Sequence, residues 1–400
     1  LIVNLGLRYE SINQANVDLK DYANPPLDRN YTIVAAEDAN YGFKDMPAQS
    51  YLLPRIGLGF PITDRATFHL NYGRYVQMAP MGYLYRSRGS GISSWGLEPV
   101  KEDKFEIGYG QLIGNFASID ITVFSRNPYD QVARDLYIPD ATQNVFGLRS
   151  HTNYVNADFT TSTGIEIDFK TSRFNNIQLF ANYVFLDARG TNSYPGSLQG
   201  NIGVRARRPT MLMATRYAQR HRGNLILDFR TGRSDNPLLS NFGANLIAEF
   251  NSGHPYTASN GSMGQRDADE GALLADNDPR NRVPTEAINS STTPWYFNLN
   301  LGLDKTFRVA NTNVKVYATI TNLLNTKHII NVYNRTGDAY DDGFLTDPAL
   351  SSKIIEGRGA TYVEMYQKIN LENRQHWLND HGWDLFGTPR EIKTGISVSF

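Results

Sequence analysis

Apolar and polar residues alternate strictly along many stretches of this chain, each about ten residues long, the length at which a tilted strand crosses a membrane. The last ten residues show the pattern most clearly, with Ile392, Thr394, Ile396, Val398 and Phe400 on one face. Because successive side chains of a strand point to opposite faces, this period predicts β-strands with one apolar face. It predicts twelve strands, at residues 1–11, 51–61, 66–77, 103–113, 117–127, 160–171, 177–189, 221–231, 242–251, 296–306, 312–323 and 391–400.

Short and long connections alternate strictly between these strands. Five are short, at residues 62–65, 114–116, 172–176, 232–241 and 307–311. Six are long and polar, near residues 12–50, 78–102, 128–159, 190–220, 252–295 and 324–390. Every long connection therefore lies at one end, as in outer-membrane barrels with short periplasmic turns and long extracellular loops. We predict an all-β, transmembrane antiparallel β-barrel whose last strand descends to the periplasm at Phe400.

Composition agrees with this prediction. The longest apolar run falls short of a transmembrane helix. Charge is balanced, with 39 Lys and Arg against 40 Asp and Glu, so no binding to nucleic acid is expected. There are no cysteines, which excludes disulfides and thiolate metal sites. Phenylalanines beside the short connections predict one interfacial aromatic girdle in contact with membrane lipid: Phe60, Phe116, Phe174, Phe242, Phe307 and Phe400.

The first residues already follow the strand pattern, without Met or a leader-like segment. We interpret residues 1–400 as a single domain that is the C-terminal portion of a longer barrel. A strand edge left open in hydrocarbon is costly, because its backbone groups find no partner. The twelve strands must therefore close on themselves or belong to a larger ring.

Four segments resemble TonB-dependent outer-membrane transporters, most of all the Bacteroidetes type with a carboxypeptidase-regulatory-like extension. Residues 54–65 (PRIGLGFPITDR) with 72–75 (YGRY) are similar to a mid-barrel hairpin of that family. Residues 96–99 (GLEP), followed by 102–108 (EDKFEIG), resemble a strand start of that family, but lack its Asn-Pro and the Lys before Pro. Residues 322–325 (NLLN) and 386–390 (FGTPR) resemble its penultimate-strand and C-terminal motifs.

The resemblance implies a barrel of roughly 22 strands plugged by an N-terminal domain, of which this chain would be the C-terminal half. It implies TonB-dependent uptake of a nutrient, such as a siderophore, oligosaccharide or peptide, with no enzymatic activity and no cofactor. The implied partners are the TonB complex, reached through the missing N-terminal region, and a surface lipoprotein. The terminal Phe400 resembles the signal that the barrel-assembly machinery reads.

Five residues in or beside the long loops are candidates for ligand binding: Tyr83, Tyr85, Trp95, His254 and Tyr256. Aromatic rings there would stack on sugars or aromatic chelators, since binding sites combine apolar faces with a few polar groups. Packing within the loops is the alternative. Residues 362–369 have Tyr362, Met365, Tyr366 and Ile369 at helical spacing, which predicts a short packing helix.

Acidic loop segments are weak candidates for calcium, which needs six to eight oxygen ligands. They comprise residues 267–270, residues 276–278, and Asp338, Asp341 and Asp342 before Gly343. None has EF-hand spacing, and solvated carboxylates are the commoner outcome. His376 and His381 are spaced too loosely for a helical metal pair, and we predict no metal centre.

A basic segment comprises Arg205, Arg207, Arg208, Arg216, Arg220 and Arg222. It would bind lipopolysaccharide phosphates or an anionic ligand by charge-assisted hydrogen bonds. Pairing with inward-facing acids of the lumen is the alternative.

A self-contained twelve-stranded barrel, acting as an enzyme or a secretion translocator, is the competing hypothesis. Such a barrel must fill its interior with its own side chains. Many inward positions are instead glycine, which leaves room for a separate domain: Gly6, Gly57, Gly59, Gly73, Gly108, Gly110, Gly243, Gly302 and Gly395. A soluble all-β adhesin is disfavoured by the recurrent apolar faces.

Overall fold

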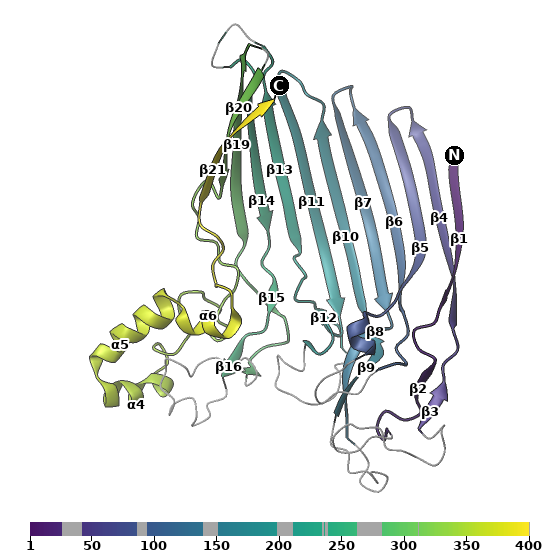
Figure 1. Cartoon of the computed structure of the whole chain (residues 1–400), viewed down its shortest axis with the longest axis vertical. Coiled ribbons are helices and arrows are strands. Elements are labelled where there is room, and N and C mark those ends of the chain that lie inside the picture. The colour runs from purple at the N-terminus through teal and green to yellow at the C-terminus, as the bar shows by residue number, and fades with distance from the viewer. Residues whose placement is uncertain are drawn as a thin grey trace.

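The computed structural model contains one large antiparallel sheet, described with its loops over residues 1–25, 42–85, 94–138, 151–197, 211–233, 236, 239–261, 282–310 and 312–399 (Figure 1). Each strand pairs with its neighbour in sequence order. The order is β1 (Ile2–Ile12), β4 (Gln49–Thr63), β5 (Ala66–Gln77), β6 (Val100–Ile113), β7 (Ala117–Tyr129), β10 (Thr160–Thr171), β11 (Ile177–Gly190), β13 (His221–Arg230), β14 (Phe242–Asn251), β19 (Tyr296–Val309), β20 (Thr312–Thr321) and β21 (Glu391–Ser399). A short β12 (Met213–Ala214) also pairs with β11.

These are the twelve predicted strands, so the all-β prediction is confirmed. Their ends differ from the alternation by a few residues, for example at β20, which ends at Thr321 although the alternation extends to Leu323. The reason is Asn322, which adopts a left-handed backbone with φ 53° and turns the chain out of the sheet. Asparagine and glycine also supply positive φ in the short turns, at Gly114, Asn176 and Asn241.

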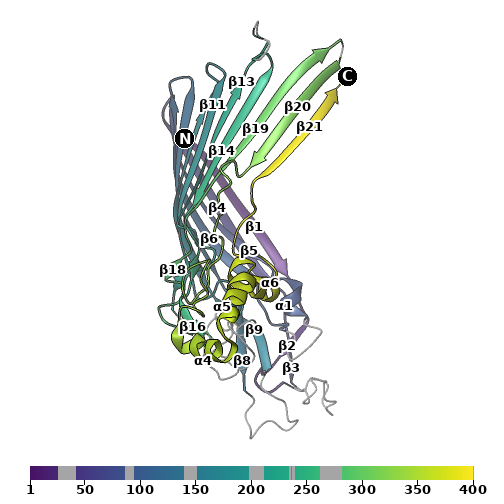
Figure 2. The same cartoon turned by 90° about the vertical axis from the view of Figure 1, so that its left-hand side faces the viewer.

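The short turns and the long loops lie at opposite ends of the sheet. In Figure 1 the turns that join hairpins such as β6–β7 lie at the upper end, whereas the helices and loop strands lie at the lower end. Figure 2 shows that the sheet curves, with β19, β20 and β21 bending away from the plane of the central strands. We call the short-turn end periplasmic and the long-loop end extracellular, as in barrels of this architecture.

One face of the sheet, which we call the outer face, is apolar and remains exposed across the middle of the sheet. Ile165 on β10, Val123 on β7 and Leu225 on β13 expose 39%, 45% and 44% of their surface. A soluble sheet would bury such a continuous apolar face, whereas lipid covers it in a membrane barrel. The opposite face carries the polar residues of the alternation, and we call it the inner wall.

Aromatic residues border the outer face at both ends. At the periplasmic end the predicted girdle residues Phe60, Phe116, Phe174 and Phe307 are exposed, while Phe400 lies outside the described residues. At the extracellular end, which the sequence analysis did not identify, the His221 ring lies 5.6 Å from Trp295 and hydrogen-bonds the Tyr183 hydroxyl at 2.8 Å. Two such belts are typical of the two headgroup regions of a bilayer.

The long loops contain the buried apolar clusters of the chain. They hold α1 (Met81–Leu84) and several short strand pairs: β2 (Val17–Leu19) with β3 (Phe43–Asp45), β8 (Gln131–Tyr137) with β9 (His151–Asp158), β15 (Pro255–Tyr256) with β18 (Ser291–Thr292), and β16 (Ser259–Gly261) with β17 (Arg282–Pro284). Leu84 and Leu97 are fully buried in one of these clusters. The loops are thus folded by their own small cores, which position the side chains at the barrel mouth.

The last long loop forms a helical layer of α4 (Pro348–Arg358), α5 (Ala360–Tyr366), a π-helical turn η2 (Gln367–Glu372) and α6 (Gln375–His381). The predicted helix over residues 362–369 is confirmed and continues from α5 into η2. Tyr362 and Tyr366 are buried against Phe344, so these two residues pack the loop, whereas Met365 is exposed. None of the helices among the described residues has the length and apolarity needed to cross a membrane.

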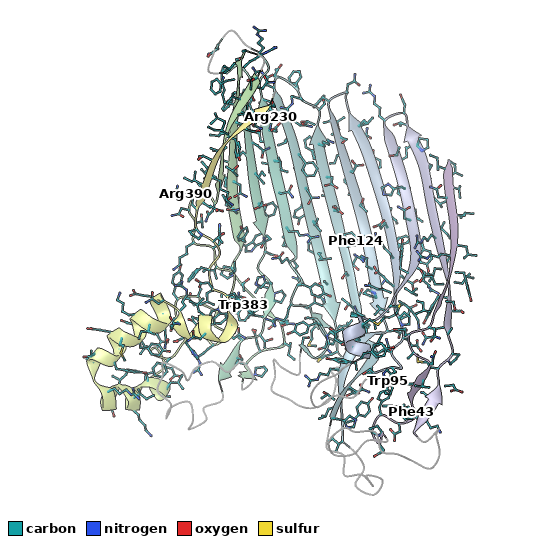
Figure 3. All side chains as sticks on the ribbon, viewed as in Figure 1. Phe43, Trp95, Phe124, Arg230, Trp383 and Arg390 are labelled. Atoms are coloured by element: carbon teal, nitrogen blue, oxygen red, sulfur yellow. The ribbon has the colours of Figure 1, made fainter. Side chains whose placement is uncertain are left out.

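The NLLN motif joins β20 to the start of β21. The Asn322 amide nitrogen donates to the Thr326 and Thr388 carbonyls at 2.9 and 3.3 Å, and its Oδ1 accepts from the Thr326 N–H at 2.9 Å. Asn325 Oδ1 accepts from the Arg390 N–H at 3.1 Å. The motif therefore ties together the two strand ends from which the helical layer emerges (Figure 3 labels Arg390 at this junction).

Candidate functional site

Two of the five predicted loop candidates, Tyr85 and Trp95, line one hollow of about 400 Å³ at the extracellular end. Tyr85 follows α1 and donates its hydroxyl to the Gln14 carbonyl at 2.8 Å, while half of its surface remains exposed. The Trp95 ring lies 6.0 Å from that of Phe43, and Figure 3 shows both at the loop end of the molecule. The other lining residues are Asn13, Gln14, Ala15, Asn16 and Val17, so aromatic faces stand beside side-chain amides.

A buried polar network holds this hollow in place. Asp18 on β2 is almost fully buried, pairs with Lys44 at 3.2 Å and accepts a hydrogen bond from the Tyr22 hydroxyl. Burial, together with that carboxylate, raises the pKa of Tyr22. Gln14 donates to the Leu97 carbonyl at 2.9 Å, which links the hollow to the α1 cluster. The rims are therefore fixed by bonds that span three separate loop segments.

Tyr83 lies outside the hollow. Its ring packs 4.7 Å from Tyr154 of β9, against the cluster that contains Leu84 and Leu97. This is the packing role that the sequence analysis gave as the alternative.

His254 and Tyr256 belong to a different loop cluster. The His254 backbone N–H donates to the Thr293 hydroxyl oxygen at 3.1 Å, and its ring Nε2 lies 2.8 Å from the Ile330 carbonyl. Tyr256 lies on β15, and burial raises its pKa. The structure thus brings together Tyr85 and Trp95 and places the other three candidates in loop packing.

The weak calcium candidates Asp338, Asp341 and Asp342 serve as local caps. Asp338 accepts from the Ala339 and Tyr340 N–H groups, and Asp341 accepts from the Gly343 N–H at 2.8 Å. Asp342 is buried and bonds the Phe344 N–H and the Tyr366 hydroxyl. The described residues bring no three His, Cys, Asp or Glu side chains together at a metal-binding distance. The acids at 267–270 and 276–278 lie outside the described residues.

Half of the predicted basic segment is described. Arg205, Arg207 and Arg208 lie outside the described residues. Arg216 and Arg220 are exposed near the extracellular end, and Arg222 is exposed on the inner wall beside Asn251. The geometry favours neither lipopolysaccharide binding nor lumen ion pairing for these three residues.

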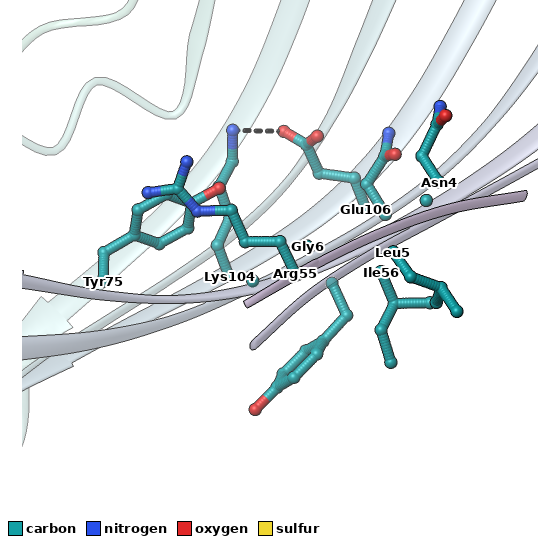
Figure 4. Close-up of a pocket in the computed structure, with 12 residues that line it drawn as sticks. Asn4, Leu5, Gly6, Arg55, Ile56, Tyr75, Lys104 and Glu106 are labelled. Carbon is teal, nitrogen blue, oxygen red and sulfur yellow. Dashed lines mark ion pairs between the residues drawn. The ribbon is translucent and has the colours of Figure 1, made fainter. Parts of the chain in front are cut away.

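The inner wall of β1, β4, β5 and β6 has a second hollow, of about 390 Å³. Figure 4 shows Arg55, Lys104 and Glu106 on one side of the sheet and Leu5 and Ile56 on the other. The Arg55 guanidinium lies 4.8 Å from the centre of the Tyr75 ring, and Lys104 pairs with Glu106 at 2.6 Å. Glycine opens the space, since a Cβ at Gly73 would lie 2.8 Å from the Tyr75 hydroxyl.

The glycines of this hollow were predicted from the sequence, but its polar lining of Arg55, Tyr75, Lys104 and Glu106 was not. A signal was present, because all four are inward positions of the alternation. Alternation within a strand does not specify the register between strands. It is this register that places Gly73 between Arg55 and Lys104 on the adjacent strands. The charged groups that line this hollow are typical of a solvated barrel lumen, in which polar side chains contact solutes or another domain.

Solved structures of outer-membrane transporters are similar to this chain, and one of them reaches a TM-score of 0.50. The transporter YddB of Escherichia coli aligns with a TM-score of 0.50 and 14% identity, over 71% of this chain and 38% of that one. The ferric citrate transporter FecA aligns with a TM-score of 0.45 and 15% identity, over 90% of this chain and 40% of that one. The ferric-catecholate receptor Fiu of E. coli K12 aligns with a TM-score of 0.47 and 13% identity, over 84% of this chain and 39% of that one. The chain spans about two fifths of the length of these structures, and no curated protein matches it.

The family comparison covers most of the chain. Its matched region begins at the first strand and ends at Leu323, within the NLLN motif that follows β20. Together with the fold it places the chain in the outer membrane as a multi-pass β-barrel protein. Because residues 1–323 match the family described as "TonB dependent receptor-like, beta-barrel", the chain belongs to the TonB-dependent receptor β-barrels.

Proposed function

We propose that the complete protein takes up a scarce nutrient across the outer membrane, with energy delivered through TonB. The family match over residues 1–323 carries this proposal. The family is one of receptors rather than enzymes, so no catalytic role is proposed. A curved sheet with an apolar outer face and a polar inner wall supplies the aqueous passage that such uptake needs.

The complete barrel needs strands besides those described. Within the described sheet β1 pairs only with β4, and β21 pairs only with β20. Both edges would expose unpaired backbone groups to hydrocarbon, at a cost of several kcal/mol per group. We therefore propose that these strands are the C-terminal half of a ring of roughly 22 strands, which encloses a separate plug domain.

The parent gene tests this part of the proposal. An upstream region with about ten further strands, preceded by a plug-like segment of roughly 120–150 residues, would support it. A signal peptide directly before Leu1 would contradict it. A second test is refolding: residues 1–400 alone should give no compact, heat-modifiable species in detergent, and such a species would support the twelve-stranded alternative.

Uptake itself is tested by growth. A host that lacks the parent gene should grow poorly when one nutrient class is limiting, among ferric chelates, oligosaccharides and peptides. Restoring the gene should restore growth only while TonB is present and the inner membrane is energised. Uptake that persists unchanged without TonB would contradict the proposal.

We further propose that the hollow of Tyr85 and Trp95 makes the first contact with the nutrient. Aromatic faces beside the amides of Asn13, Gln14 and Asn16 suit a solute with flat apolar faces and hydroxyl or amide edges. Replacing Tyr85 and Trp95 by alanine should weaken binding of that nutrient by about tenfold or more. Tyr194, which is 55% exposed on another loop, is the control, and its alanine variant should bind normally.

The remaining partners are also proposals. Lipopolysaccharide would contact the extracellular aromatic belt around Trp295. The barrel-assembly machinery would read the terminal strand, and a surface lipoprotein would cover the extracellular loops. Deleting Phe400 should lower the amount of receptor in the outer membrane while leaving its transcription unchanged.

A further inference from the structure

One row of polar residues crosses five strands of the inner wall. Asp168 on β10, Asn182 on β11, Asn224 on β13, Glu249 on β14 and Asn298 on β19 are successive cross-strand partners. Neighbouring strands lie about 4.8 Å apart, so the row is about 19 Å long. On its far side Asp120 of β7 is the cross-strand partner of Asp168.

The row runs obliquely through the wall. Asp168 lies three residues from Thr171, the periplasmic end of β10, whereas Asn298 lies two residues from Tyr296, the extracellular end of β19. A line of cross-strand partners is perpendicular to the strands, and strands of such barrels are tilted by about 35–45°. The row therefore rises along the wall from one mouth toward the other.

Amides are the donors within the row. Asn182 donates to Asp168 at 2.6 Å, and Asn298 donates to Glu249 at 3.2 Å. Two flanking residues of the same wall join them: Glu166, 3.4 Å from the Asn182 amide, and Asn300, 3.4 Å from Glu249. Each carboxylate thus holds one or two neutral donors and keeps further acceptor positions open.

Positive charge is missing from the row. Within the described part of the chain, Asp120, Glu166, Asp168 and Glu249 make no ion pair, although Lys170 and Arg222 project from the same wall. Asp120 and Asp168 lie directly opposite each other, an arrangement of like charges that destabilises a strand pair. This row has therefore gathered carboxylates without the cations that neutralise Asp228 and Asp304 nearer the periplasmic end of the same wall.

Asn298 gives an independent sign of a missing partner. Its side chain is only 5% exposed, and its amide nitrogen is engaged by Glu249 and Asn300. Its Oδ1 has no hydrogen-bond partner in the described structure, and neither does Oδ1 of Asn224. Buried acceptors of this kind are normally satisfied, so the row lacks donors as well as positive charge.

We propose that this row binds a positively charged group, an ammonium or guanidinium, on the solute that the receptor takes up. Such groups carry positive charge and several N–H donors, which are the two things that the row lacks. The proposal rests on the proposed uptake function and adds a substrate class to it, namely a cationic solute such as a basic oligopeptide. The oblique course offers this group successive carboxylates on its way through the barrel.

The experiment measures binding of trilysine to the complete receptor in detergent, with triserine as the neutral probe. The test variant combines Asp168→Asn with Glu249→Gln, which removes two charges and keeps the side-chain shapes. The control variant combines Glu10→Gln with Glu102→Gln, which removes two charges from the same wall outside the row. Thermal unfolding of all three proteins is followed in parallel.

The test variant should bind trilysine about tenfold more weakly than the parent, while triserine binding stays unchanged. Raising the salt concentration should weaken trilysine binding to the parent and to the control, and much less to the test variant. Equal losses in the test and control variants, or no loss in either, would overturn the proposal.

A basic segment of the receptor's own interior domain is the other occupant that this chemistry would accept. In that case the test variant would lower the unfolding temperature of the receptor and leave trilysine binding unchanged, which also overturns the proposal. Binding in detergent needs no TonB. Failure of the uptake function would therefore show in the growth experiment and leave this binding result standing.

Discussion

On the inner wall of β1 to β7, most charged side chains lie in cation–carboxylate pairs, whereas in the row from Asp168 to Asn298, which we call the acid and amide stretch, carboxylates lie beside amides. Nearer the periplasmic end of the same strands, Arg230 pairs with Asp228 and Asp304. Arg8 with Glu10, Lys104 with Glu106 and Arg126 with Glu102 are joined at 2.5–2.6 Å. The paired stretch neutralises its own charge. The acid and amide stretch keeps a negative potential directed into the lumen. The same alternation therefore produces one stretch in which most charges are paired within the wall and one whose carboxylates lack cations.

The largest expected effect is at the extracellular edge of the acid and amide stretch. Asn322 donates its backbone N–H to Asn300 Oδ1 at 3.0 Å and makes three further side-chain bonds. Asn322→Ala loses those side-chain bonds and puts alanine at φ 53°, so we expect a loss of about 2–4 kcal/mol of stability. Heat-modifiability of the complete receptor in detergent measures it.

Glycine at the same position separates the two causes. Asn322→Gly loses the bonds and accepts the positive φ, so it should cost about 1 kcal/mol less than alanine. Hydrogen exchange should rise in β14 and β19 and stay unchanged in β5 and β6. A uniform rise across the sheet would mean that the two stretches are not independent.

A charge reversal at Arg126 would disrupt the paired stretch. Arg126→Glu leaves Glu102 without its cation and adds a third carboxylate beside Glu106. The site is half-exposed, so we expect a loss of about 1–2 kcal/mol, measured by thermal unfolding. Arg8→Gln, at a more exposed pair, should change stability by less than about 0.5 kcal/mol. If the two variants behave alike, pairing is not what stabilises this stretch.

The sheet could be predicted from the sequence because each strand alternates apolar and polar residues, with the apolar residues on the face that lipid covers. All twelve strands follow from alternation alone, and β20 ended early only because Asn322 takes a left-handed backbone. Site residues were harder to predict. The row from Asp168 to Asn298 depends on the register between strands, which no pattern within a single strand specifies. Tyr85 and Trp95 line the same hollow, whereas Tyr83 packs in a loop core. No periodic pattern in the sequence predicts that core.

The helical layer also contains one carboxylate that bonds a cation and one that bonds only neutral donors. Arg374 bonds Asp384 at 2.6 and 2.8 Å and lowers the pKa of that carboxyl. Burial raises the pKa of Asp342, which bonds only uncharged donors. Stability from Asp384 is present above the ordinary carboxyl pKa and is lost as the pH falls through its lowered value.

For Asp342 the sign is opposite. Its protonated form is favoured in the folded loop, so that stability is present below the ordinary carboxyl pKa and is lost as the pH rises through its raised value. Protease protection of residues 348–381 should therefore decline on both sides of an optimum near the ordinary carboxyl pKa. Asp342→Asn should remove the decline on the alkaline side and leave the acid side unchanged. An unaltered profile in that variant would assign the alkaline loss to another group.

The smallest expected effect supplies the acid and amide stretch with the cation it lacks. Asn224 lies between Asn182 and Glu249 as a cross-strand partner of both. Lysine at this position would place an ammonium beside Glu249 and within reach of Asp168, and should stabilise the receptor by about 0.5–1 kcal/mol. Asn71→Lys is the matching substitution in the paired stretch, beside Glu106. Because Lys104 already pairs with Glu106, this lysine should stabilise the receptor less. Because the lysine of Asn224→Lys would occupy the positive site, trilysine binding should fall as thermal stability rises. A fall in trilysine binding together with a rise in thermal stability would indicate that these carboxylates bind a cationic ligand. If the carboxylates are only hydrated, the substitution should leave trilysine binding unchanged.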